Sequence, residues 1–99
     1  MAENVRLYAG THDGVVVWRS KNGGWEEASR SFTGEIIDSF AGCRKQPERV
    51  FVGVTHDGLY RTDDGGKKWI KVLQGDVRSV AVDPADDKVI YAGLEPVQL

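Results

Sequence analysis

Val50-Phe51-Val52-Gly53-Val54-Thr55-His56-Asp57-Gly58 is the most informative stretch of the sequence, because most of it occurs twice. Residues 7–14 read Leu-Tyr-Ala-Gly-Thr-His-Asp-Gly, and residues 90–93 read Ile-Tyr-Ala-Gly. The aromatic positions Tyr8, Phe51 and Tyr91 follow one another at spacings of 43 and 40 residues. A period of this size is typical of repeat architectures. We therefore expect repeat units at about 5–48 and 49–88, with the start of a third at 89–99.

Each unit consists of short segments of alternating apolar and polar residues, separated by turn signals. This alternation predicts strands, and Asp13-Gly14 and Asp57-Gly58 predict tight turns between them. No segment has a helical period. The expected strands are Val5–Gly10, Val15–Arg19, Trp25–Ser29, Glu35–Phe40, Arg49–Val54, Leu59–Thr62, Lys68–Leu73, Val77–Val82 and Lys88–Gly93. Four short strands that recur about every 40 residues are typical of a β-propeller blade.

A turn motif lies between two of these strands. Thr62-Asp63-Asp64-Gly65-Gly66-Lys67-Lys68-Trp69 fits the pattern Ser/Thr-x-Asp-x-Gly-x-x-Trp. We expect Asp64 to accept backbone N–H groups, Gly66 to adopt a conformation that disfavours other residues, and Trp69 to pack over the hairpin. The first copy lacks two residues before its tryptophan but keeps the positions Ser20, Asn22, Gly24 and Trp25. The motif and the repeat together resemble the BNR/Asp-box repeats of sialidase-like β-propellers.

This resemblance implies an all-β fold of antiparallel four-stranded blades, two blades per chain. The strands then run from the second strand of one blade, through a complete blade, to the second strand of a third. A closed propeller needs about four to eight blades, so the resemblance implies a homo-oligomeric ring with head-to-tail contacts. A trimer is favoured and a tetramer is next. The alternative is that the chain is a truncated piece of a longer propeller.

The same resemblance places a ligand-binding face on the loops opposite the Asp boxes. The candidate residues on that face are His12, Asp13, Arg30, His56, Asp57 and Asp76. The two His-Asp pairs could bind a metal or sugar hydroxyls. The simpler interpretation is that Asp-Gly forms each turn and the histidine lies exposed beside it. Packing in the strands is expected to explain all three tryptophans, which weakens a lectin interpretation.

The sequence gives little support for catalysis. It has no Gly-x-Ser-x-Gly, phosphate-loop or His-Glu-x-x-His motif. Glu35 and Asp38 begin an inner strand, where a glycosidase could place an acid–base pair. The second copy has Gly75 and Arg78 at these positions, so such a pair would form only between subunits. We expect no catalytic residues, no cofactor and no metal site.

Composition restricts the partners and the compartment. The 99 residues include 13 Lys and Arg against 15 Asp and Glu, a net charge of −2, which argues against a nucleic-acid surface or a polybasic membrane anchor. The single cysteine, Cys43, excludes a disulfide within the chain. No apolar run approaches the roughly 18 residues of a membrane-spanning helix, and no leader pattern is present. We expect a cytoplasmic protein, or a secreted one if a signal has been removed.

The sequence therefore predicts a non-catalytic β-propeller module that assembles with itself and binds a partner or a small ligand. Two alternatives remain open at this point. One is a lectin-like carbohydrate binder, and the other is a fragment of a glycoside hydrolase-type propeller. They differ in a measurable way, because the first binds glycans without changing them and the second hydrolyses an aryl glycoside.

Overall fold

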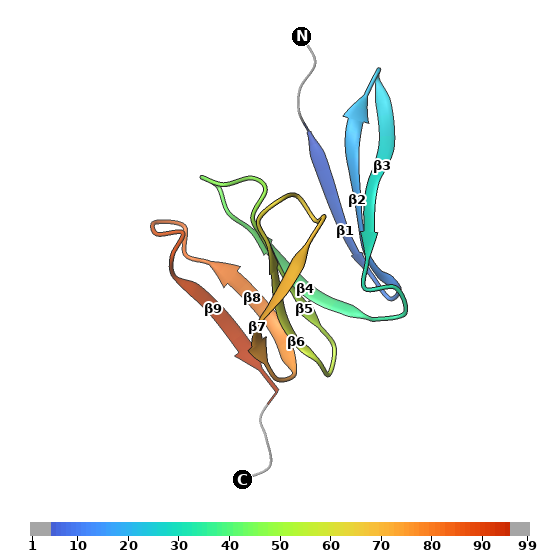
Figure 1. Cartoon of the computed structure of the whole chain (residues 1–99). Helices are drawn as coiled ribbons and strands as arrows, with labels where there is room; N and C mark the ends of the chain where they lie inside the picture. Colours follow the sequence, from blue (N-terminus) through green and yellow to red (C-terminus); the bar gives the residue numbers. More distant parts are fainter. Residues whose placement is uncertain (1–4, 96–99) are drawn as a thin grey trace.

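The computed structural model describes residues 5–95, which form an all-β structure with no helix in that range (Figure 1). Residues 1–4 and 96–99, the latter part of the expected third unit, lie outside the described residues. Every expected strand is present, and its ends differ from the expectation by at most two residues. The strands are β1 (Arg6–Thr11), β2 (Gly14–Lys21), β3 (Gly24–Ser31), β4 (Ile37–Gly42), β5 (Val50–Val54), β6 (Gly58–Thr62), β7 (Trp69–Gln74), β8 (Val77–Val82) and β9 (Ile90–Leu94).

These strands form three antiparallel sheets, which confirms the expected strand type. Sheet 1 has the order β1-β2-β3, sheet 2 the order β4-β5-β6-β7, and sheet 3 the order β8-β9. Sheet 2 lies between the other two, and β8 runs beside β4 (Figure 1). The described residues thus form an open row of sheets, not a closed ring. Within residues 5–95 there is no helix long and apolar enough to cross a bilayer.

Two apolar layers hold the sheets together. Successive side chains of a strand point to opposite faces, so Val50 and Val52 of β5 face sheet 1 while Phe51 faces sheet 3. Strand β5 of sheet 2 is therefore buried on both faces, whereas the outer strand β7 is largely exposed, and sheets 1 and 3 are each covered on one face. The buried residues of the layer between sheets 1 and 2 are Val15, Val17, Ile37, Val50, Val52 and Val54. Those of the layer between sheets 2 and 3 are Cys43, Phe51, Leu59 and Val77.

The hairpin between β6 and β7 is closed by its own side chains. Asp64 Oδ1 accepts hydrogen bonds from the backbone nitrogens of Lys67 and Lys68, at 3.1 and 3.0 Å. The buried hydroxyl of Thr62 accepts from the Gly66 nitrogen at 3.0 Å and donates to Asp64 Oδ1 at 2.8 Å. Gly66 has a φ of 96°, a conformation that L side chains rarely adopt. The Lys68 backbone N–H and the Thr62 hydroxyl, in that order, lower the pKa of the Asp64 carboxyl.

The corresponding hairpin between β2 and β3 has a different geometry. Ser20 and Trp25 lie opposite each other in the strand ladder. Asn22 and Gly23 have φ values of 50° and 80°, which are typical of a two-residue type I′ turn. The shorter sequence therefore forms a tight turn in place of the longer loop between β6 and β7, with Gly24 as the first residue of β3.

The two hairpin tryptophans have different surroundings. The Trp69 ring packs edge-to-face on Phe32, with 5.3 Å between ring centroids, and its Nε1 donates to Ser31 Oγ at 3.1 Å. Trp25 is 54% exposed. The expectation that packing explains every tryptophan therefore fails for Trp25. Among the described residues, no neighbouring sheet covers the face of sheet 1 that lies away from sheet 2.

Candidate functional site

Four connections meet at the end of the sheets opposite the β6–β7 hairpin. They are the turns that join β1 to β2 and β5 to β6, and the loops that join β3 to β4 and β7 to β8. Asp13 Oδ1 accepts from the Gly34 nitrogen at 2.7 Å, which ties the first turn to the first loop. Asp76 Oδ1 accepts from the His56 nitrogen at 3.1 Å, which ties the second turn to the second loop. We call residues 11–14, 32–36, 55–57 and 74–76 the turn face.

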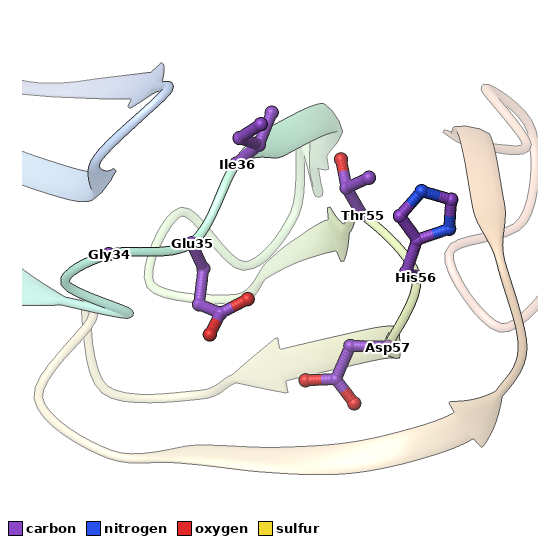
Figure 2. A pocket seen from close by; sticks show the side chains of 6 residues that line it. All are labelled: Gly34, Glu35, Ile36, Thr55, His56 and Asp57. Carbon is purple, nitrogen blue, oxygen red and sulfur yellow. The ribbon is translucent and has the colours of Figure 1, made fainter.

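A cavity of about 470 Å³ opens on the turn face (Figure 2). Its lining residues are Gly34, Glu35, Ile36, Thr55, His56 and Asp57. Figure 2 shows the carboxylates of Glu35 and Asp57 on one side of the opening, while the His56 ring points away from them. The His56 side chain is largely exposed, so this side of the cavity opens to solvent. Carboxylate and hydroxyl groups of this kind suit a ligand that donates hydrogen bonds.

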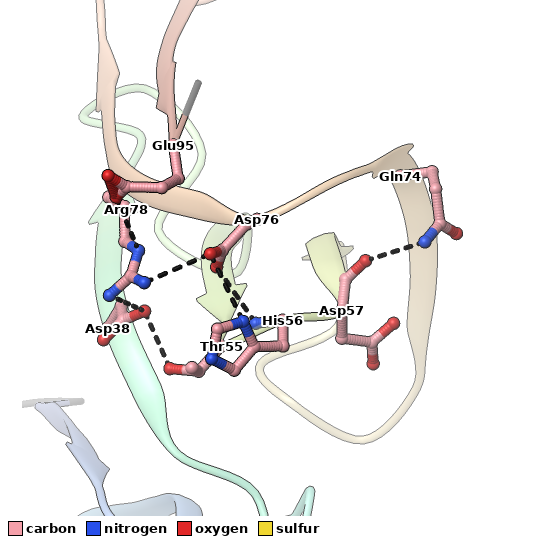
Figure 3. A network of polar contacts seen from close by, with 8 residues as sticks. All are labelled: Asp38, Thr55, His56, Asp57, Gln74, Asp76, Arg78 and Glu95. Atoms are coloured by element: carbon pink, nitrogen blue, oxygen red, sulfur yellow. Dashed lines mark hydrogen bonds and ion pairs between the residues drawn. The ribbon is translucent and has the colours of Figure 1, made fainter. Parts of the chain in front are cut away.

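Beside the cavity, Arg78 is surrounded by three carboxylates (Figure 3). Its guanidinium lies 3.1 Å from Asp76, 3.4 Å from Glu95 and 3.8 Å from Asp38. The Thr55 hydroxyl donates to Asp38 Oδ2 at 2.7 Å. Each of these pairs is partly exposed, and such pairs contribute little stability singly. Together they connect β4, β8, the end of β9 and the turn after β5.

Asp57 belongs to a second polar cluster, directed toward β6 and β7. Lys71 Nζ lies 2.7 Å from Asp57 Oδ1, and the Tyr60 hydroxyl donates to Asp57 Oδ2 at 2.9 Å. The bond from Lys71 lowers the pKa of the Asp57 carboxyl. Burial, followed by the bond to Asp57, raises the pKa of Tyr60. At neutral pH Asp57 is therefore an ionised, paired carboxylate and Tyr60 a protonated phenol, which suits positioning better than acid–base or nucleophilic chemistry.

Of the residues predicted from the sequence, the structure brings His56 and Asp76 into contact, while the Asp57 side chain turns toward Lys71 and Tyr60. The His56 backbone N–H is the first cause, and the Arg78 charge a further one, of a lowered pKa at Asp76. His56 Nδ1 lies 3.3 Å from Asp76 Oδ2. Arg30 is engaged elsewhere, in a two-point pair with Glu27 on the same strand, at 2.9 and 3.1 Å.

The two His-Asp turns differ in shape, although the sequence places them at equivalent positions. The first spans two residues between Thr11 and Gly14, and Gly14 carries the positive φ of 92°. The second spans three residues between Val54 and Gly58, and His56 itself has a φ of 59°. The second histidine lies beside the Asp76 carboxylate. Within residues 5–95 no group of three His, Cys, Asp or Glu residues is arranged to hold a metal ion.

Four further residues belong to the site but were not predicted from the sequence: Thr55, Lys71, Arg78 and Glu95. A signal for one of them was present, because Arg78 occupies the repeat position of Asp38. Opposite charges at one repeat position on adjacent inner strands favour an ion pair. The contacts of Lys71 and Glu95 depend on how the sheets turn toward one another, and no sequence pattern reports this.

Comparisons with known proteins found no matching protein-family model, no matching curated protein and no matching solved structure.

Proposed function

We propose that this chain is a non-catalytic, two-blade β-propeller segment that closes with copies of itself into a ring. A ring of three copies has six blades, and a ring of four has eight. The turn face of each copy then lies on one side of the ring, where it binds a partner or a small ligand that donates hydrogen bonds.

The observation that carries this proposal is the exposure of repeat-equivalent residues. Leu7 and Val50 occupy the same repeat position, yet Leu7 is 48% exposed and Val50 only 4%. Phe51 and Tyr91 are also equivalent, and they are 5% and 58% exposed. The exposed members lie on the two outermost sheet faces, and the buried members lie between sheets. Each outer face thus has the composition of a face that is covered elsewhere in the same chain.

The strands that sheets 1 and 3 lack, compared with sheet 2, support the same proposal. Sheet 1 has no strand beside β1 equivalent to β4, and sheet 3 has no strands beyond β9 equivalent to β6 and β7 among the described residues. Unpaired strand edges and apolar sheet faces are liabilities for a single chain in water. Joining sheet 3 of one copy to sheet 1 of the next supplies what each lacks. Because the two surfaces differ, the contact is head to tail and closes by rotation.

A binding role fits the turn face better than a catalytic one. Asp57 of the turn face and Asp38 of the adjacent strand β4 already have cationic and hydroxyl partners. Asp57 contacts Lys71 and Tyr60, and Asp38 contacts Arg78 and Thr55. Such groups hold a fixed charge and orientation and do not cycle a proton easily. Repetition of the opening around a ring would present one shallow polar site per copy, and several weak contacts made at once raise the overall affinity.

The test is to place a charge on one outer face. Leu7→Glu should yield a monomer by sedimentation velocity, with an unchanged far-ultraviolet circular dichroism spectrum, because the new carboxylate would be buried between copies. Ile36→Glu is the matched control, since Ile36 is 40% exposed but lies on the turn face, and this variant should stay assembled. The proposed contact would be contradicted if both variants assembled, or if both were monomers.

A further inference from the structure

Strands β1 and β9 carry nearly the same sequence. Residues 7–10 read Leu-Tyr-Ala-Gly and residues 90–93 read Ile-Tyr-Ala-Gly. In sheet 3, Ile90 pairs with Val82 and Ala92 pairs with Val80, and both face the layer shared with sheet 2. A β1 strand in the same place would put Leu7 opposite Val82 and an alanine opposite Val80. The apolar contacts of β8 would then be retained.

Beyond β9, the outer half of sheet 2 is uncovered. A groove of about 480 Å³ lies there, between β6 and β7 on one side and β9 on the other. Exposed apolar side chains of β7, including Val72 and Leu73, form one wall. The corresponding surface of sheet 1 is, by contrast, covered by β6 and β7 of the same chain, which contribute Tyr60 and Trp69 to the layer between sheets 1 and 2. The groove therefore lies where two further strands, equivalent to β6 and β7, would follow β9.

A second opening lies on the free edge of β1. It has a volume of about 310 Å³, and Tyr8, Phe40 and Val50 are among its lining residues. Phe40 is exposed there, whereas its repeat equivalent on β8, Val80, packs against the second layer. Sheet 2 has β4 at the corresponding edge, so this opening is suited to the equivalent strand, β8, of another copy.

From these features we infer that the assembly forms by strand exchange: β1 of one copy takes the place of β9 on β8 of the preceding copy. This inference rests on the proposed self-assembly. The incoming β1 brings β2 and β3 with it, and they fill the groove beside β6 and β7. Strand β9 is then a cap, which covers β8 in the free chain and leaves when a second copy docks.

The contacts indicate that β9 leaves and β1 stays. Strand β9 pairs with a single neighbour at five positions. Beyond the ladder, the Glu95 backbone N–H donates to the Asp76 carbonyl at 2.9 Å, and the Glu95 side chain pairs with Arg78 (Figure 3). Strand β1 pairs with β2 at six positions. It also packs so closely on β4 that a Cβ at Gly10 would lie 2.8 Å from Ile37 Cγ2.

A disulfide that locks β9 to β8 tests the exchange. Ala81 and Tyr91 are directly opposite in the ladder, and such pairs lie about 4.5–5.5 Å apart at Cα, within disulfide range. In a Cys43→Ala background, Ala81→Cys with Tyr91→Cys should run as a single chain when oxidised and as a ring after reduction. The reduced sample shows in the same protein that both substitutions are compatible with folding and assembly.

The matched control locks β1 to β2 through Arg6→Cys with Arg19→Cys, which are also opposite each other. This variant should assemble equally well oxidised and reduced. A β8–β9 lock that still assembles when oxidised, or a β1–β2 lock that blocks assembly, would overturn the exchange and leave the proposed ring intact. A Cys43→Ala parent that is monomeric at every concentration would instead refute the ring itself.

Discussion

Thr62→Val should destabilise the fold well beyond the usual effect of a surface change. Thr62 is fully buried, and its hydroxyl accepts from the Gly66 nitrogen at 3.0 Å and donates to Asp64 at 2.8 Å. Valine has nearly the same shape, so no cavity forms, but the buried Gly66 N–H loses its acceptor. An unsatisfied buried donor costs about 1–3 kcal/mol. The exposed Asp64 carboxylate can turn to water and adds little.

We therefore expect the free energy of unfolding to fall by about 2 kcal/mol, and the midpoint of thermal unfolding by about 10 °C in a chain of this size. Urea and thermal unfolding at one fixed protein concentration would measure both, since assembly makes stability depend on concentration. Thr55→Val is the control, because its hydroxyl bond to Asp38 is exposed. A loss in Thr62→Val no greater than in Thr55→Val would refute the hairpin account.

Three further outcomes are expected. Gly66→Ala should cost more stability in urea unfolding than Gly34→Ala, because both positions have positive φ but only a Cβ at Gly66 would meet a neighbour, at 3.0 Å from Val17. The free energy of unfolding should decline in acid, because the pKa of the Asp64 carboxyl is lowered in the folded protein. The stabilisation by ionised Asp64 is complete above the unfolded pKa of about 3.9. It is lost as the pH falls through the lower folded pKa. Asp64→Asn should flatten that decline in a pH series of urea titrations, and an unchanged slope would contradict it. Cys43, buried and with its thiol pKa raised by that burial, should react with a thiol reagent far more slowly in the native protein than in urea.

The sequence repeat was sufficient to predict the number, order and approximate limits of the strands within residues 5–95. It succeeded because the strands either alternate or are rich in β-branched and aromatic residues, and because Gly and Asp mark the turns between them. Register was harder to predict. Trp18 and Tyr60 each stand two residues before the first position of their turn motif. In the ladders, however, Trp18 lies opposite Leu7 while Tyr60 lies opposite Val52, two positions further along the preceding strand of its unit. The tight turn at Asn22 allows β2 to extend, and motif matching does not detect such an extension.

The candidate site was predicted only where it depends on neighbours in sequence. His56 and Asp57 follow directly from the turn pattern, and Asp76 from its loop. Arg78 was missed because its partners come from three other segments, brought together by the way sheet 3 packs on sheet 2. Contacts of that kind depend on the angle between sheets, which side-chain periodicity does not encode.

The central claim is that this chain completes its sheets with copies of itself. The most direct test is its absolute mass in solution, from light scattering behind size exclusion across a dilution series. The account predicts one sharp species at three times 10.9 kDa, or at four times for the eight-bladed ring, that persists on dilution. A mass of 10.9 kDa at every concentration would contradict it.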